Sequence, residues 1–176
     1  MKKQIKIFVI AAFALLCGSN VIAQDLSQAG ELYNNAATAL NEGNFQVALD
    51  GFKQALAAAE ALGEEGAALA TDCKNIIPKI YIQLGKEAAS NKDMDKAAEL
   101  LGQANKLATE YGQTEVAASA KETLTQVLIA DGNSLLNEKK YAEAIASYTK
   151  ATELDPANGV AYLRIGMCKG ASGDEQ

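Results

Sequence analysis

Small and large apolar residues recur at a fixed helical spacing in three segments of the chain. Each segment opens with a short polar turn and then Phe45, Met94 or Tyr141. It continues with Ala, a large residue four positions later, and Ala again after three more. The three sets are Ala48, Phe52 and Ala55; Ala97, Leu101 and Ala104; and Ala144, Tyr148 and Ala151. On a helix these offsets form one stripe, against which a neighbouring helix packs closely.

A second pattern, which combines large apolar residues with glycine, precedes the second and third turns and recurs after Pro156. Its residues are Tyr81, Leu84, Gly85 and Ala88; Leu128, Gly132 and Leu135; and Tyr162, Ile165 and Gly166. Together the patterns predict seven helices, near residues 26–42, 45–62, 67–90, 94–111, 114–138, 141–154 and 157–171. Pro78 is expected to kink or to start the helix that contains it. The tyrosines at pattern positions, Tyr81, Tyr141, Tyr148 and Tyr162, are expected in the core.

The spacing resembles the tetratricopeptide repeat, whose pattern is W-x₂-L-G-x₂-Y, then A-x₃-F, then P. The third unit fits best, with Gly132, Leu135, Ala144, Tyr148 and Pro156 at pattern positions. Ala48 and Ala97 are 49 residues apart, and Ala97 and Ala144 are 47 apart, whereas the family repeat has about 34 residues. The alternative is an Ala-rich helical bundle in which the spacing arises by chance.

The resemblance implies an all-α, TPR-like superhelix of antiparallel helix pairs, with about three and a half units and lengthened helices. The units are expected near residues 26–62, 67–111 and 114–156, with a partial unit at 157–176. Gly173 and Asp174 correspond to Gly43 and Asn44 of the first turn. The chain is therefore expected to be a fragment of a longer protein, and the alternative is that its last helix caps the stack.

Proteins of this family bind extended peptides or partner helices on a concave face, which the first helix of each pair lines. In register with the pattern, the inward positions are Tyr33, Asn41, Lys79, Ile82, Lys86, Ser90, Gln126, Ile129, Asn133, Asn137 and Leu163. Their amide, lysine and aliphatic side chains suit a peptide backbone, a carboxylate and apolar anchors. Asn133 matches the Asn of the family's carboxylate clamp, but Ile129 replaces its Lys, so that clamp is not implied. The alternative for Lys79 and Lys86 is a solvated surface.

The amino terminus has the layout of a secretory signal peptide over residues 1–23. A basic start is followed by an apolar stretch from Ile7 to Cys17 and by Val21-Ile22-Ala23. Cleavage is expected before Gln24, which leaves residues 24–176 as an exported repeat domain, periplasmic or secreted. The alternative is a lipoprotein signal with Cys17 acylated, although Leu16 stands where such signals have Gly or Ala.

Composition restricts the chemistry of the mature chain. Hydrophobic residues make up 49% of the sequence, aromatic residues only 6%, and Trp and His are absent. Without Lys2, Lys3 and Lys6 of the leader, 13 basic and 22 acidic residues remain, a net charge of −9. This balance disfavours nucleic acid and anionic membranes. Cys73 and Cys168 lie on first helices two units apart, so we expect two buried free thiols rather than a disulfide.

These observations favour a binding protein over an enzyme. No nucleophile has a recognisable base partner, and zinc, haem and Cys-His chemistry lack ligands, so neither cofactor nor metal is expected. We predict a protein–protein interaction module, a scaffold or adaptor of the bacterial cell envelope, with a protein or peptide as partner. After removal of the leader no membrane insertion is expected, and a homodimer is plausible. The alternatives are a small-molecule or glycan receptor and a regulatory amino-terminal segment of a longer protein.

Overall fold

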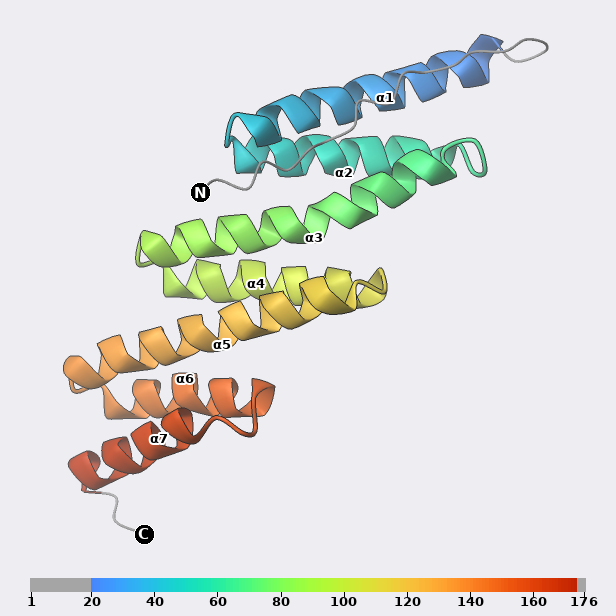
Figure 1. Ribbon diagram of the computed structural model, residues 1–176. Helices are drawn as coiled ribbons and strands as arrows, with labels where there is room; N and C mark the ends of the chain where they lie inside the picture. Colours follow the sequence, from blue (N-terminus) through green and yellow to red (C-terminus); the bar gives the residue numbers. More distant parts are fainter. Residues whose placement is uncertain (1–19, 174–176) are drawn as a thin grey trace. The chain divides into compact units, whose positions relative to one another are not determined.

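The computed structural model describes the backbone of residues 20–173 and the side chains of residues 25–173. This part of the chain forms seven α-helices (Figure 1). They are α1 (Asn20–Asn41), α2 (Phe45–Ala61), α3 (Ala67–Ser90), α4 (Met94–Glu110), α5 (Thr114–Asn137), α6 (Tyr141–Leu154) and α7 (Gly159–Ser172). The prediction of an all-α, TPR-like helical repeat is confirmed.

The helix boundaries follow the sequence pattern to within two residues, except at the start of α1. This helix begins at Asn20 rather than near Leu26, because neither proline nor glycine lies between these residues to interrupt it. α3 runs on both sides of Pro78, so the helix does not start there. The expected leader and Cys17 lie outside the described residues, apart from the backbone of residues 20–23.

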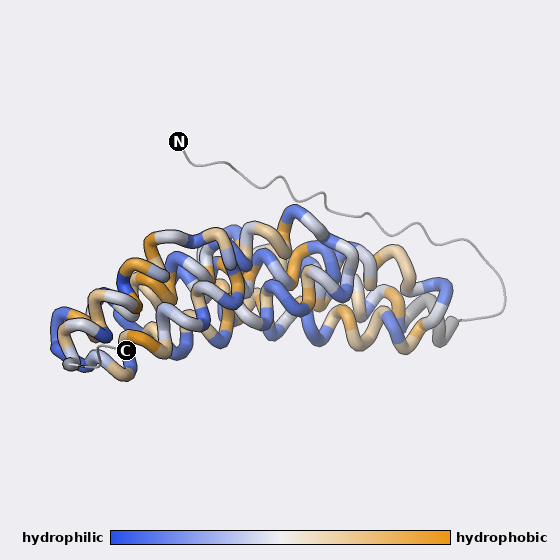
Figure 2. The backbone as a smooth tube through the Cα atoms, turned by 90° about the horizontal axis from the view of Figure 1, so that it is seen from below, coloured by the Kyte–Doolittle hydropathy of each residue, from blue (hydrophilic) through white to orange (hydrophobic). Residues whose placement is uncertain are grey.

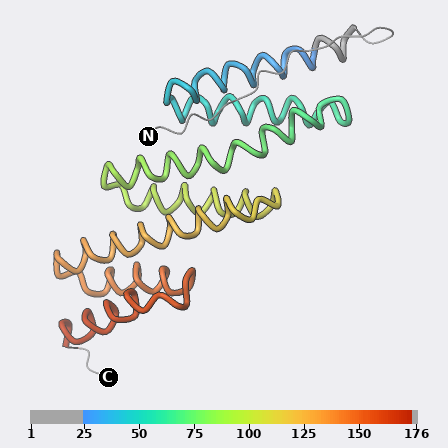
Figure 3. Tube along the Cα trace, viewed as in Figure 1, coloured from blue at the N-terminus to red at the C-terminus, as the bar shows by residue number. Residues whose placement is uncertain are grey.

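The chain divides into two compact units, one up to Ile80 and one from Tyr81. The first unit contains α1, α2 and residues 67–80 of α3. The second contains residues 81–90 of α3 and the helices α4 to α7, in which α4, α5, α6 and α7 follow one another as packed neighbours. The trace in Figure 3 shows this order. In Figure 2, hydrophobic and hydrophilic positions alternate along the helices, as expected for helices with one buried side.

In the first unit, α1 and α2 pack as a pair through small and aromatic residues. The rings of Tyr33 and Phe52 meet edge to face, with centroids 5.2 Å apart. A methyl group added at Gly51 would lie 2.8 Å from the Ala36 Cβ, so the backbones approach closely. Ala36 occupies the position that Gly85 and Gly132 hold in the later repeats. In this unit the second helix supplies the glycine instead.

In the second unit, glycines on the first helix of each pair receive large side chains from the second helix. A Cβ at Gly85 would lie 2.6 Å from Leu101 Cγ, and a Cβ at Gly132 would lie 2.6 Å from Tyr148 Cε1. The predicted stripe is confirmed, since Ala97, Leu101 and Ala104, like Ala144, Tyr148 and Ala151, are fully buried.

The three predicted turns share one hydrogen-bond scheme. In the first, Gly43 has a φ of 82°, its N–H donates to the Leu40 carbonyl, and the Asn44 N–H donates to the Ala39 carbonyl. This is the Schellman arrangement that ends many helices. Lys92 and Lys139 take the place of Gly43 in the other two turns, with φ values of 64° and 60°. The alignment of these turns in the sequence therefore reflects a common backbone structure.

The two described cysteines, Cys73 and Cys168, are free and buried, as predicted. Burial, with a contribution from Asp72, raises the pKa of the Cys73 thiol to about 12. Burial also raises the pKa of the Cys168 thiol. Both side chains therefore stay protonated and serve as apolar core residues.

The tyrosine prediction is correct only in part. Tyr148 and Tyr81 are buried and Tyr141 is half-buried, but Tyr162 on α7 is exposed. The prediction was wrong for Tyr162 because α6 is the one extensive neighbour of α7 among the described helices. The side of α7 that carries Tyr162 therefore remains open.

Candidate protein-binding surface

Four of the predicted partner-binding residues form one stripe along α5. Gln126, Ile129, Asn133 and Asn137 are separated by three or four positions, so they share a helix face. Gln126 and Asn137 are exposed, whereas Ile129 and Asn133 are half-buried. This face presents amide groups on either side of an aliphatic side chain. We call these four residues the α5 stripe.

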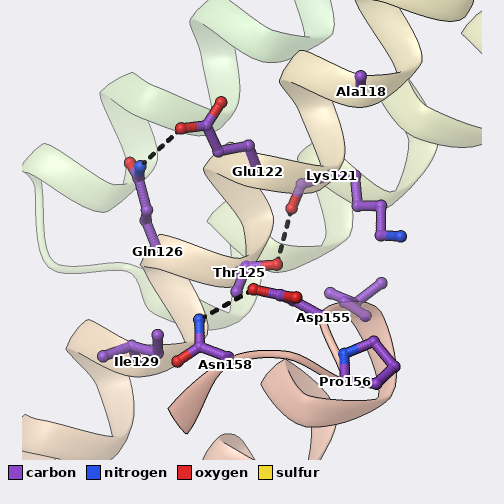
Figure 4. A pocket seen from close by; sticks show the side chains of 10 residues that line it. Ala118, Lys121, Glu122, Thr125, Gln126, Ile129, Asp155, Pro156 and Asn158 are labelled. Carbon is purple, nitrogen blue, oxygen red and sulfur yellow. Dashed lines mark hydrogen bonds between the residues drawn. The ribbon is translucent and has the colours of Figure 1, made fainter. Parts of the chain in front are cut away.

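The amino-terminal part of the stripe opens into a hollow of about 430 Å³ within the second unit (Figure 4). One wall is α5, and the other is the turn between α6 and α7. The lining residues are Ala118, Lys121, Glu122, Thr125, Gln126, Ile129, Leu154, Asp155, Pro156 and Asn158. Gln126 and Ile129 therefore share this hollow with residues that the sequence analysis did not predict to bind a partner.

Hydrogen bonds within the α6–α7 turn fix the second wall. The Asp155 carboxylate accepts from the Ala157 N–H at 3.2 Å and from Asn158 Nδ2 at 3.2 Å. Asn158 caps α7, because its Oδ1 accepts from the Ala161 N–H at 3.1 Å. Both polar side chains are thus held in place before any partner arrives. A signal for this turn was present in the sequence, since Asp and Asn around a proline favour turns and helix caps.

The α5 wall carries both charged and neutral polar groups. Gln126 Nε2 donates to Glu122 Oε1 at 3.4 Å, and the Thr125 hydroxyl donates to the Lys121 carbonyl at 2.9 Å, as Figure 4 shows. The Lys121 side chain is exposed at the rim. Together with Ile129 and Pro156, these groups offer a ligand a cation, a carboxylate, an amide and apolar contacts.

Asn133 has a structural bond as well as a place in the stripe. Its Oδ1 accepts a hydrogen bond from the Tyr148 hydroxyl at 2.8 Å. Burial raises the pKa of Tyr148, so the phenol stays protonated and continues to donate. Because Oδ1 accepts from Tyr148, Nδ2 is the atom of this amide that is placed to donate to a partner.

The other predicted residues fall into exposed and buried groups. Lys86, Ser90 and Leu163 in the second unit are exposed, as are Asn41 and Lys79 in the first. The Ser90 hydroxyl donates to the Lys86 carbonyl at 2.9 Å. Tyr33 and Ile82, by contrast, are buried. Tyr33 packs on Phe52 between two helices, and neither side chain is accessible to a partner, so both are left out of the surface that we propose below.

The described residues contain no group of three or more His, Cys, Asp and Glu side chains that could hold a metal ion. None of their helices is both long and apolar enough to cross a membrane.

Part of the chain that forms this surface matches a known sequence family. Residues 132–158 match the family model of the tetratricopeptide repeat. This part of the chain is similar to a tetratricopeptide repeat. The match begins at Gly132, which receives Tyr148, and ends at Asn158, which caps α7. It therefore covers the end of α5, the whole of α6 and the turn that walls the hollow.

Tetratricopeptide repeats generally mediate protein–protein interactions, and proteins of this family are typically non-catalytic scaffolds. A comparison with curated proteins gives no match. Outside residues 132–158, the repeat is visible in the structure: the turn, the buried alanine stripe and the glycine contact of this segment recur around Lys92, Ala97 and Gly85.

Proposed function

We propose that this chain is a tetratricopeptide-repeat protein that binds an extended peptide segment of a partner protein along the α5 stripe and in the adjoining hollow. The observation that carries the proposal is the continuity of exposed amides with a hollow whose far wall is fixed by hydrogen bonds. A preorganised wall lowers the entropy cost of binding. Such a surface suits the general role of the family.

The groups in the hollow define the partner chemistry. Amide side chains such as Gln126 and Asn137 can pair with the donors and acceptors of a peptide backbone. Ile129 and Pro156 provide apolar contacts for one aliphatic or aromatic anchor. Lys121 at the rim can pair with a carboxylate, and the carboxylates of Glu122 and Asp155 in the same hollow can pair with a cation. Such charge pairs add specificity more than affinity.

A small-molecule or glycan receptor is the second candidate, and the volume of the hollow favours it. Ligand sites of this type usually bury most of the ligand surface. Here several lining residues, including Lys121, Gln126 and Pro156, are themselves exposed. An exposed lining suits a peptide that continues beyond the hollow on both sides, so we favour the peptide.

We further propose that the protein is exported and acts as a scaffold or adaptor in the cell envelope. The support is the sequence layout of residues 1–23, with a basic start, an apolar stretch and Ala23 before Gln24. Mass spectrometry of the mature amino terminus tests this. A terminus at Gln24 supports soluble export, a lipidated Cys17 indicates an anchored form, and an intact Met1 contradicts export.

The binding proposal is tested by affinity capture from envelope extract with a triple variant, Gln126→Ala, Ile129→Ala and Asn137→Ala. The control is the pair Thr149→Ala and Lys150→Ala, two exposed positions on α6 outside the hollow. We expect the triple variant to lose partners that wild type and control both retain. Equal recovery with all three proteins would refute the proposed surface. Native mass spectrometry of the purified protein would reveal a small ligand, if the second candidate is right.

A further inference from the structure

Tyr148 on α6 carries a hydroxyl group that its packing role does not need. Its ring fills the gap above Gly132, whereas in the preceding pair Leu101 fills the gap above Gly85 without any polar group. Tyr148 is fully buried, and its hydroxyl donates to Asn133 Oδ1 at 2.8 Å. A buried hydroxyl is costly unless it is hydrogen-bonded, so this hydroxyl depends on its bond to the α5 stripe.

The combination of a buried hydroxyl and a surface amide is found in one of the three described helix pairs. The equivalent positions hold neither group elsewhere: they are occupied by Ala37 and Phe52 in the α1–α2 pair and by Lys86 and Leu101 in the α3–α4 pair. The bond is therefore a local feature of the α5–α6 pair. It is found where the proposed peptide surface lies, and it is not a general part of the repeat.

The bond fixes which atom of the Asn133 amide faces a ligand. Because Oδ1 accepts from the hydroxyl, Nδ2 is the end directed away from Tyr148. In the opposite orientation Nδ2 would face the hydroxyl oxygen, and the hydroxyl hydrogen would lose the one acceptor that the described structure gives it. An unpaired donor in a buried position is unfavourable. Asn133 is therefore held as a hydrogen-bond donor towards a ligand.

Gln126, two turns earlier on the same face of α5, is oriented the opposite way. Its Nε2 donates to Glu122 Oε1 at 3.4 Å. A carboxylate can only accept hydrogen bonds, so turning the amide round would place Gln126 Oε1 against a negatively charged oxygen. Oε1 is therefore the end that Gln126 offers to a ligand. In order along the helix, the α5 stripe presents an acceptor at Gln126, the aliphatic Ile129 and a donor at Asn133.

The spacing of the two amides suits an extended peptide backbone. Seven residues of an α-helix span about 10.5 Å, and an extended peptide advances about 3.3 Å per residue, so about three peptide residues cover this distance. Alternate residues of an extended chain direct their backbone N–H and C=O groups to the same side. The first and third residues of such a segment can therefore meet Gln126 and Asn133. A helical ligand uses these backbone groups internally and has none to offer.

From these observations we propose that Tyr148 and Glu122 are positioning residues of the peptide site and set the hydrogen-bond polarity of the α5 stripe. The segment that they select is extended, with a backbone N–H at Gln126, a backbone C=O at Asn133 and an aliphatic side chain near Ile129. A segment with the two backbone groups exchanged would place donor against donor and acceptor against acceptor. This inference rests on the proposed function and defines its ligand more narrowly.

A capped pentapeptide, acetyl-Thr-Ala-Leu-Ala-Thr-amide, is the probe, and NMR titration of the isotope-labelled protein measures its binding, because so short a segment binds weakly. Tyr148→Phe keeps the ring and removes the hydroxyl, so it should weaken binding about threefold or more. Ser147→Ala is the matched control. It removes the neighbouring hydrogen bond between the same two helices, from Ser147 to Asp131, and should bind the probe as wild type does.

The readout specific to a positioning role is the dependence on the amides. Asn133→Ala should weaken binding, and adding Tyr148→Phe to it should have no further effect, because the hydroxyl acts through the amide. Asn133→Asp keeps the acceptor for Tyr148 but presents an oxygen in place of Nδ2, so it should bind no better than Asn133→Ala. Glu122→Gln should weaken binding by otherwise wild-type protein and have no effect together with Gln126→Ala.

Three results would overturn the inference: wild-type affinity of Tyr148→Phe, an equal loss with and without the Asn133 amide, or an equal loss in Ser147→Ala, which would assign the effect to helix packing. If wild type does not bind the pentapeptide, the backbone recognition is refuted, and capture from envelope extract alone decides the proposed function. If the triple variant binds the pentapeptide as wild type does, the proposed surface fails as a whole. If the triple variant loses binding while Tyr148→Phe keeps it, only the positioning role fails.

Discussion

The contact between Gly132 and Tyr148 makes the substitution Gly132→Ala a sharp test of the packing. The added Cβ would lie 2.6 Å from Tyr148 Cε1 and 2.8 Å from Cδ1 and Cζ. These are three atoms of a rigid, fully buried ring, whose hydroxyl is also bonded to Asn133. The ring cannot move aside as the end of a flexible side chain could, so either the two helices separate or the bond is lost.

The expected magnitude follows from opposing contributions. Alanine is favoured over glycine in a helix by about 1 kcal/mol. Overpacking a core costs about 1–3 kcal/mol, and loss of the hydrogen bond from Tyr148 adds about 1 kcal/mol. The net result is a fall of about 1–3 kcal/mol in the free energy of unfolding. Gly166→Ala, at an open position, should instead raise it by up to about 1 kcal/mol.

Urea unfolding followed by circular dichroism at the helix band measures both variants. The decisive comparison is made in a Tyr148→Ala background, where the ring is absent and Gly132→Ala no longer meets it. There the same substitution should become neutral or stabilising, which is a reversal of sign. If Gly132→Ala destabilises the protein equally with and without the ring, or is as stable as Gly166→Ala, the packing argument is refuted.

Three further predictions concern the turns, a thiol and the wall of the hollow. Lys92→Gly and Lys139→Gly should each raise the free energy of unfolding by up to about 1 kcal/mol, because both lysines have positive φ. Urea unfolding measures this change. Lys150→Gly, inside α6, is a control that should destabilise the protein. Cys73, whose pKa is raised from 9.0 to about 12, should react with a thiol reagent at pH 8 only through unfolding, so its rate should rise with urea. The contribution of the Cys73 thiol to stability is present below pH 9 and is lost as pH rises from 9 towards 12, because the thiol ionises first in the unfolded state. In Cys73→Ala, this part of the fall of the unfolding free energy with pH should be absent. Asp155→Ala removes the acceptor of two hydrogen bonds, so it should lower the free energy of unfolding by about 1 kcal/mol and weaken partner capture. The control Asp50→Ala on α2 should leave capture unchanged.

The helical framework could be predicted because the spacing of the apolar residues and the positions of the turns indicate the same structure. Ala97, Leu101 and Ala104 give both helical spacing and a close-packed face, and the turn before them ends one helix and starts the next. The turn geometry itself could be inferred only from the alignment of the three segments. Lysine is an unfavourable residue at positive φ, so Lys92 and Lys139 do not reveal the Schellman turns on their own.

The candidate site was less predictable, because it depends on which residues face each other across helices. Gln126 and Ile129 were identified from the helix register, but Asp155 and Asn158 reach the same hollow from a turn about thirty residues later in the chain. Tyr33 follows the same register as Asn41, yet it is buried because Phe52 packs on it. A register gives the direction of a side chain on its own helix. It does not give the size of the side chain opposite.

The same limit explains why Tyr162 and Tyr81 differ although they occupy the same pattern position. Each precedes a glycine by four residues, and Gly85 is covered by Leu101 while nothing in the described chain covers Gly166. In a repeat protein each unit completes its core with a neighbouring helix, so a residue typical of a core is a surface residue where no described helix covers it. Such positions are visible only when the pattern and the packing are compared.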